Sequence, residues 1–69
     1  MTLTYTNHAR ARTCQRGIKR KKVKEVIEKG SVIIQSEKKL KYSYEDISVV
    51  VEIKFKEREL VIVTVMINY

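Results

Sequence analysis

His8, Arg12 and Arg16 follow one another at intervals of four residues in the first part of the chain. Four residues are slightly more than one helical turn, so the three side chains are predicted to lie along one face of a helix. Two guanidinium groups can bind phosphate oxygens, and an imidazole beside them can act as a general base or acid. The alternative is structural: His8 caps or packs at the helix start, and the arginines cover a sheet edge with their aliphatic stems.

A second group of cations opens the next predicted helix. The run Lys19-Arg20-Lys21-Lys22, followed by Lys24, opposes the helix dipole, and no Ser, Thr, Asp or Asn caps this helix. A bound phosphate would offset both features, because the free N–H groups of a helix N-terminus attract anions. These five cations are therefore predicted to contact a nucleic-acid backbone. A lysine-rich surface that only keeps the protein in solution is the alternative.

Three further side chains complete the predicted nucleic-acid contacts. Tyr42 and Tyr44 share one face of a predicted strand and can stack on unpaired bases, although packing under a helix is the alternative for both. Arg58, in a polar turn, is assigned as a supplementary group. No metal or cofactor is expected, because Cys14 has no second cysteine and the phosphate-loop, dinucleotide and zinc motifs are missing.

The positive charge is concentrated in the first thirty residues. They hold nine Lys or Arg and two Glu, whereas residues 31–69 hold six side chains of each sign, so the first part carries the whole net charge of +7. Such segregation indicates a polyanionic partner. The length of 69 residues predicts a single domain over 1–69. A lone cysteine, no signal-peptide pattern and no apolar run of membrane-spanning length predict a cytoplasmic protein without membrane contact.

Helix signals dominate up to Gly30, and strand signals follow. Helices are predicted over residues 7–16, capped by Asn7 and ended by Gly17, and over residues 20–29, ended by Gly30. Apolar alternation then predicts four strands, at 31–35, 40–44, 47–55 and 60–67. The last is apolar everywhere except Thr64, which indicates a strand inside the sheet and covered on both faces. The predicted fold class is α+β, with two N-terminal helices packed on a four-stranded, mainly antiparallel sheet.

The spacing of these residues also resembles a family pattern. The matching residues are His8-Ala9, Arg12, Arg16-Gly17-Ile18, Val23, Val26-Ile27 and Gly30, and Leu60-Val-Ile-Val-Thr-Val65 is similar to the closing I-x-T-V strand. They resemble H-A-x-x-R-x-x-x-R-G-I, the motif of a small, mostly uncharacterised bacterial and phage domain family. That family is grouped by fold with RelE- and BrnT-like toxins of the barnase–EndoU–colicin–RelE group, which cleave RNA without metal. Lys19 departs from the pattern, since a Ser or Thr cap normally stands there.

The resemblance implies a toxin-type domain with RNA and an antitoxin protein as partners. His8 would then be the base or acid of a metal-independent endoribonuclease, and Arg12 and Arg16 would stabilise charge on the phosphate. Two other functions stay open. The domain can be a non-catalytic nucleic-acid-binding module, read as a winged helix-turn-helix with residues 20–29 in the major groove. It can also be a protein-interaction domain or homodimer whose strand at 60–67 pairs with a partner.

Overall fold

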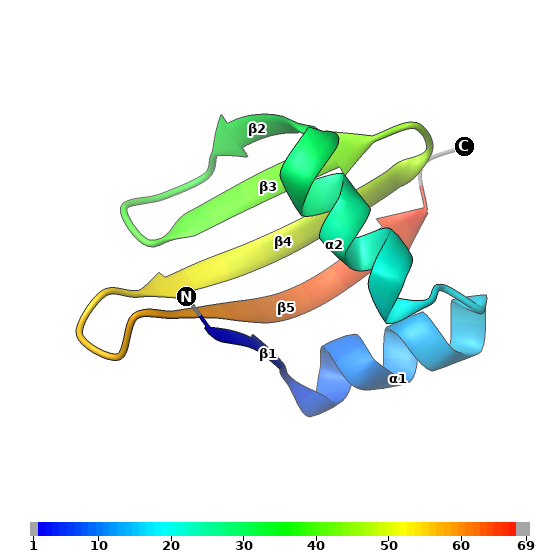
Figure 1. Cartoon of the computed structure of the whole chain (residues 1–69), viewed down its shortest axis with the longest axis horizontal. Helices are drawn as coiled ribbons and strands as arrows, with labels where there is room; N and C mark the ends of the chain where they lie inside the picture. The colour runs from blue at the N-terminus through cyan, green and yellow to red at the C-terminus, as the bar shows by residue number, and fades with distance from the viewer. Residues whose placement is uncertain (1, 68–69) are drawn as a thin grey trace.

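Residues 2–67 are described by a computed structural model, in which two helices and one five-stranded sheet form an α+β fold (Figure 1). The elements, in chain order, are β1 (Thr2–Tyr5), α1 (Asn7–Arg16), α2 (Arg20–Lys29), β2 (Ser31–Ile34), β3 (Lys39–Tyr44), β4 (Ile47–Lys54) and β5 (Glu59–Ile67). The prediction of an α+β fold is therefore confirmed, and both helices have the predicted bounds. Within residues 2–67, no helix is long and apolar enough to cross a membrane.

The sheet has the strand order β1-β5-β4-β3-β2, so the prediction of four strands was one short. β1 pairs in parallel with β5, from Thr2 opposite Glu59 to Tyr5 opposite Ile62, while the other three pairings are antiparallel. Four residues without a flanking turn are too short for a reliable alternation signal, and a partner more than fifty residues away leaves no local trace. The prediction that β5 lies inside the sheet is confirmed.

One face of the sheet carries the core. Val23 and Val26 of α2 are fully buried against β4, where Ile47, Val49 and Val51 point toward the helix. Ile62 and Val65 of β5 belong to the same cluster. The remaining residues of β5 are only half-buried, because no described element covers the other face of the sheet, so the predicted burial of β5 on both faces was wrong.

α1 packs differently from α2. It contacts β5 and β1 but neither β4 nor α2, and it continues along the edge of β5 from the point where β1 ends (Figure 1). Ala9 is its single buried residue, so α1 has no apolar stripe with which to cover a sheet face. The prediction that both helices pack on the sheet therefore holds for α2, whereas α1 closes an edge.

The N-terminal cap of α1 differs from the sequence prediction, whereas its C-terminal end agrees with it. Thr6, not the predicted Asn7, is the N-cap: its Oγ1 accepts a hydrogen bond from the Ala9 N–H at 3.1 Å and donates to the Val63 carbonyl at 3.1 Å. Gly17 adopts the left-handed conformation (φ 65°) and ends the helix as predicted. The Ile18 N–H donates to the Thr13 carbonyl at 2.9 Å, which completes a Schellman motif.

Replacing Thr6 by alanine is expected to lower the free energy of unfolding by about 1–2 kcal/mol, because one hydroxyl both caps α1 and ties it to β5. Asn7→Ala is the matched control and should change stability by less than about 0.5 kcal/mol, since Asn7 is exposed within the first turn. Urea denaturation of both variants measures the difference. Equal losses would show that Thr6 does not have this double role.

Gly30 ends α2 by a close approach between backbones. Its φ of −77° is open to any residue. A side chain is nevertheless excluded, because a Cβ at this position would clash with the Val26 carbonyl oxygen and would lie 2.6 Å from the Ser43 carbonyl oxygen. The glycine thus lets the end of α2 rest directly on β3.

Candidate functional site

A cleft of about 500 Å³ lies where the α1–α2 turn meets the β3–β4 turn and the end of β5. Its apolar floor includes Ile47 and Ile67. Cations line the rim from both helices, and the full set of charged residues around it is Arg16, Lys19, Lys21, Lys22, Glu25 and Asp46. The Schellman turn at Gly17 brings the end of α1 and the start of α2 to the same opening.

Within residues 2–67, Lys22 is the one cation of the cleft rim that forms ion pairs with carboxylates. Its Nζ lies 2.8 Å from Glu25 Oε1 and 3.5 Å from Glu45 Oε2, and it stands 5.3 Å from the centre of the Tyr44 ring. The hydrogen bond with Glu25 raises the pKa of Lys22, and the same bond lowers the pKa of Glu25. Lys22 therefore holds the carboxylates beside the cleft rather than offering its charge to a ligand.

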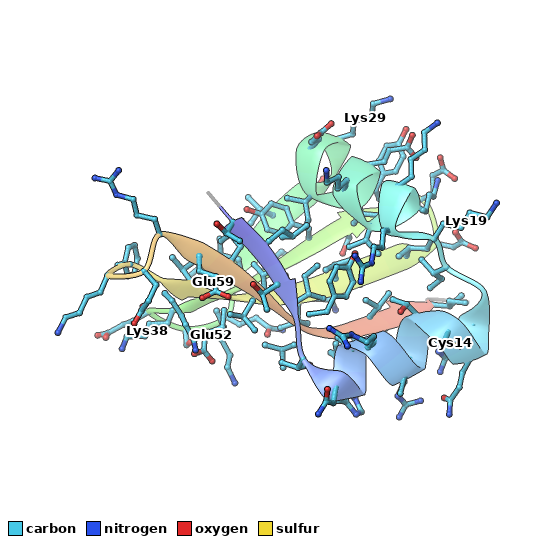
Figure 2. All side chains as sticks on the ribbon, turned by 60° about the horizontal axis from the view of Figure 1, so that its bottom comes forward. Cys14, Lys19, Lys29, Lys38, Glu52 and Glu59 are labelled. Carbon is cyan, nitrogen blue, oxygen red and sulfur yellow. The ribbon has the colours of Figure 1, made fainter. Side chains whose placement is uncertain are left out.

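Arg16, Lys19 and Lys21 are exposed and form no ion pair with any carboxylate of residues 2–67. Figure 2 shows Lys19 and Lys29 pointing into solvent from the two ends of α2. Lys19 is the N-cap of α2, and its side chain makes no capping hydrogen bond, as the sequence predicted. The positive end of the helix dipole is thus surrounded by unpaired cations, an arrangement that costs free energy without an anion.

A second hollow of about 480 Å³ lies between β1 and α2, on the other side of the first turns of α2. Leu3 and Tyr5 form one wall, and Arg20, Lys21 and Lys24 form the other. The Arg20 guanidinium carbon stands 5.2 Å from the centre of the Tyr5 ring. Because Lys21 lines both hollows, the free cations form a continuous strip across the start of α2. We call these residues the cationic strip: Arg16, Lys19, Arg20, Lys21 and Lys24.

Tyr5 is a residue of this site that the sequence did not single out. Its hydroxyl oxygen is buried and has no hydrogen-bond partner in residues 2–67. Burial raises the pKa of this phenol, and the nearby Arg20 charge partly opposes the rise. The only sequence signal for this position of the ring is the alternation of polar and apolar residues over 2–5, which is too short to predict a strand.

Tyr5→Phe is expected to raise the free energy of unfolding by about 1 kcal/mol at neutral pH, because it removes a buried hydroxyl without a partner. The advantage should grow above pH 10.0, the ordinary tyrosine value: there the unfolded wild type ionises first, so wild-type stability falls as pH rises toward the folded pKa. Urea denaturation over a pH series measures this. A destabilised Tyr5→Phe variant at neutral pH would show that the hydroxyl has a partner.

The structure does not bring the other predicted site residues into the cleft. His8 is exposed on the first turn of α1 and Arg12 is half-buried; they share a helix face with Arg16, but His8 lies about 12 Å from it along the axis. Tyr42 and Tyr44 pack against the core on the helix side of β3. Arg58 lies in the β4–β5 turn, at the other end of β4 from the cleft.

No three His, Cys, Asp or Glu side chains come together within residues 2–67. Cys14 lies exposed on α1 (Figure 2). The Arg and Lys side chains that line the cleft carry nitrogen donors that can bind an anion.

Comparison with known proteins gives one match. No curated protein and no solved structure was found to be similar to the chain. A family model described as "Domain of unknown function (DUF4258)" matches residues 5–67, a span that includes both helices, the whole cationic strip and β2 to β5. The chain therefore belongs to the DUF4258 family of domains of unknown function.

Proposed function

We propose that this domain binds RNA through its sugar-phosphate backbone, and that the cationic strip is the binding surface. The observation that carries the proposal is the difference in ion pairing among the cations around the cleft. Lys22 pairs with Glu25 and Glu45, and Lys29 also lies 3.8 Å from Glu25, while Arg16, Lys19 and Lys21 line the same opening without an ion pair to any carboxylate of residues 2–67. These three side chains are therefore available to bind an anionic ligand.

The shape of the strip favours a polymer over a single small anion. The strip joins two hollows on opposite sides of α2, and Lys21 belongs to both. A chain of phosphates can occupy both hollows at once, whereas one phosphate fills only one. The ring of Tyr5 under Arg20 gives the second hollow an aromatic wall, which suits an unpaired base. The resemblance to a family that is grouped by fold with RelE- and BrnT-like toxins favours RNA over DNA.

Cleavage of the bound RNA is a separate part of the proposal. A metal-independent endoribonuclease needs a base, a charge stabiliser and an acid around one phosphate. Arg16 stands at the cleft and can stabilise charge there, but His8 lies about 12 Å away along α1. Binding therefore has more support from the geometry than cleavage, and one assay can measure both.

The test is fluorescence anisotropy with end-labelled single-stranded RNA in EDTA over a salt series, with gel analysis of the same samples. Five phosphate contacts, one for each cation of the strip, predict a slope of log affinity against log salt of about −3.5. Shortened RNA that is absent with Arg12→Ala would establish cleavage. Intact RNA with the expected slope would establish a binding module. No binding at low salt would overturn the proposed function.

A further inference from the structure

β2 is an edge strand with an unusual surface. Nothing in the described structure lies beyond it in the sheet (Figure 1), and Val32, Ile33 and Ile34 are 52%, 59% and 74% exposed. Residues 31–34 contain neither a charge nor a proline. Edge strands are normally protected by such residues, because an open edge is a template for pairing with another chain. This edge is both apolar and unprotected.

The backbone of β2 also offers a defined set of hydrogen-bonding groups. β2 pairs with β3 in the register Ile33 opposite Lys41, and the Gln35 N–H continues that register by donating to the Lys39 carbonyl at 2.9 Å. Hydrogen-bonded positions alternate along an antiparallel strand. Ile33 and Gln35 therefore bond to β3, and the N–H and C=O groups of Val32 and Ile34 point away from the sheet.

We propose that two copies of this chain pair through β2, antiparallel about a two-fold axis, into one continuous ten-stranded sheet. With Ile33 at the axis, Val32 lies opposite Ile34 of the partner subunit, and the outward backbone groups of these two residues meet in four hydrogen bonds. On the helix side of the sheet the pairing brings together Val32 and Ile34 from both copies. On the other side Ile33 meets its own counterpart.

Charge at the two ends of β2 favours a second copy over a different partner. Lys29, whose Nζ lies 3.8 Å from Glu25 Oε2 in an exposed ion pair, precedes the strand, and the exposed Glu37 follows it. Antiparallel pairing places the start of β2 in one copy, which follows Lys29, near the end of β2 in the other copy, which precedes Glu37, twice in the dimer. The cationic strip lies at the start of α2, away from β2, so the two copies keep their excess positive charge apart. The edge is therefore complementary to itself in apolar contacts, backbone groups and charge.

Sedimentation equilibrium of the full chain over a hundredfold concentration range tests the dimer. We expect a concentration-dependent dimer in the wild type. Ile33→Lys places like charges opposite each other at the axis and should weaken association at least tenfold. Phe55→Lys is the matched control, because Phe55 is 64% exposed in the β4–β5 turn, and it should leave association unchanged. A monomer at every concentration, or a dimer unaffected by Ile33→Lys, would overturn the proposal.

Two further measurements identify the interface. Lys29→Glu and Glu37→Lys should each weaken the dimer about threefold to tenfold, and the double variant should restore it. Amide exchange should slow with protein concentration at Val32 and Ile34 but stay slow at every concentration at Ile33. Failure of the charge swap to restore association, or equal exchange of the three amides, would place the contact elsewhere. None of these results depends on RNA binding.

Discussion

Gly30→Ala is expected to lower the free energy of unfolding by about 3 kcal/mol. The added Cβ would meet two backbone carbonyl oxygens, those of Val26 and Ser43, and neither can rotate away as a flexible side chain could. Relief would require α2 to lift off β3, and the burial of Val26 would be reduced with it. For a domain of this size such a loss lowers the Tm by about 12–24 °C, which thermal and urea denaturation can measure.

Gly17→Ala is the control for Gly30→Ala. Gly17 has a φ of 65°, but a Cβ there would have no neighbour within 4 Å. The expected loss is the cost of the left-handed conformation alone, about 1 kcal/mol. A loss at Gly30 no larger than the loss at Gly17 would show that the end of α2 can move away from β3 at little cost.

Reversing two charges of the cationic strip is expected to weaken RNA binding about a hundredfold at low salt. The variant is Lys19→Glu combined with Lys21→Glu, which removes two phosphate contacts from the cleft and adds repulsion. The salt slope should also fall in magnitude, from about −3.5 to about −2, because three of the five phosphate contacts are left. Anisotropy with labelled RNA measures both quantities, and circular dichroism confirms the fold.

Lys56→Glu combined with Arg58→Glu gives the same change in net charge at the far end of the sheet. These residues lie in the exposed β4–β5 turn, away from the cleft. This variant is expected to reduce binding less than threefold. Equal losses in the two double variants would mean that RNA responds to total charge, and would remove the cleft from the proposed function. They would also restore Arg58 as a binding residue.

The helices could be predicted from sequence because their boundaries are local. Gly17 with Ile18 marks the end of α1, and the stripe of Val23, Val26 and Ile27 defines α2 within one short segment. The parallel β1–β5 pairing could not be predicted, since it joins segments more than fifty residues apart. The cap of α1 was misplaced by one residue because Thr6 and Asn7 are both good caps, and contact with Val63 favours Thr6.

The positive charge of the candidate site could be predicted from the sequence, but which of its lysines forms an ion pair could not. The run from Lys19 to Lys24 predicts a cationic surface, and in the structure these residues lie at the start of α2. Helix spacing allows Glu25 to pair with Lys21 or with Lys22, and the structure shows the pair with Lys22, which Glu45 also reaches from the β3–β4 turn. The relation of His8 to Arg16 was read from helix spacing alone, and a shared face does not bring two ends of a helix to one opening.

The dependence of β1 and α1 on β5 has a consequence for how the chain folds. Thr6 donates a hydrogen bond to Val63, 57 residues later, and β1 pairs only with β5. Helix α2 and the strands β2, β3 and β4 can close through short loops, whereas β1 and α1 have no strand to pack against until β5 exists. Long-range closure of this kind slows folding. During synthesis the cationic helix α1 is therefore expected not to pack against the sheet until β5 has emerged from the ribosome. β1 and α1 are then the last elements to join the fold.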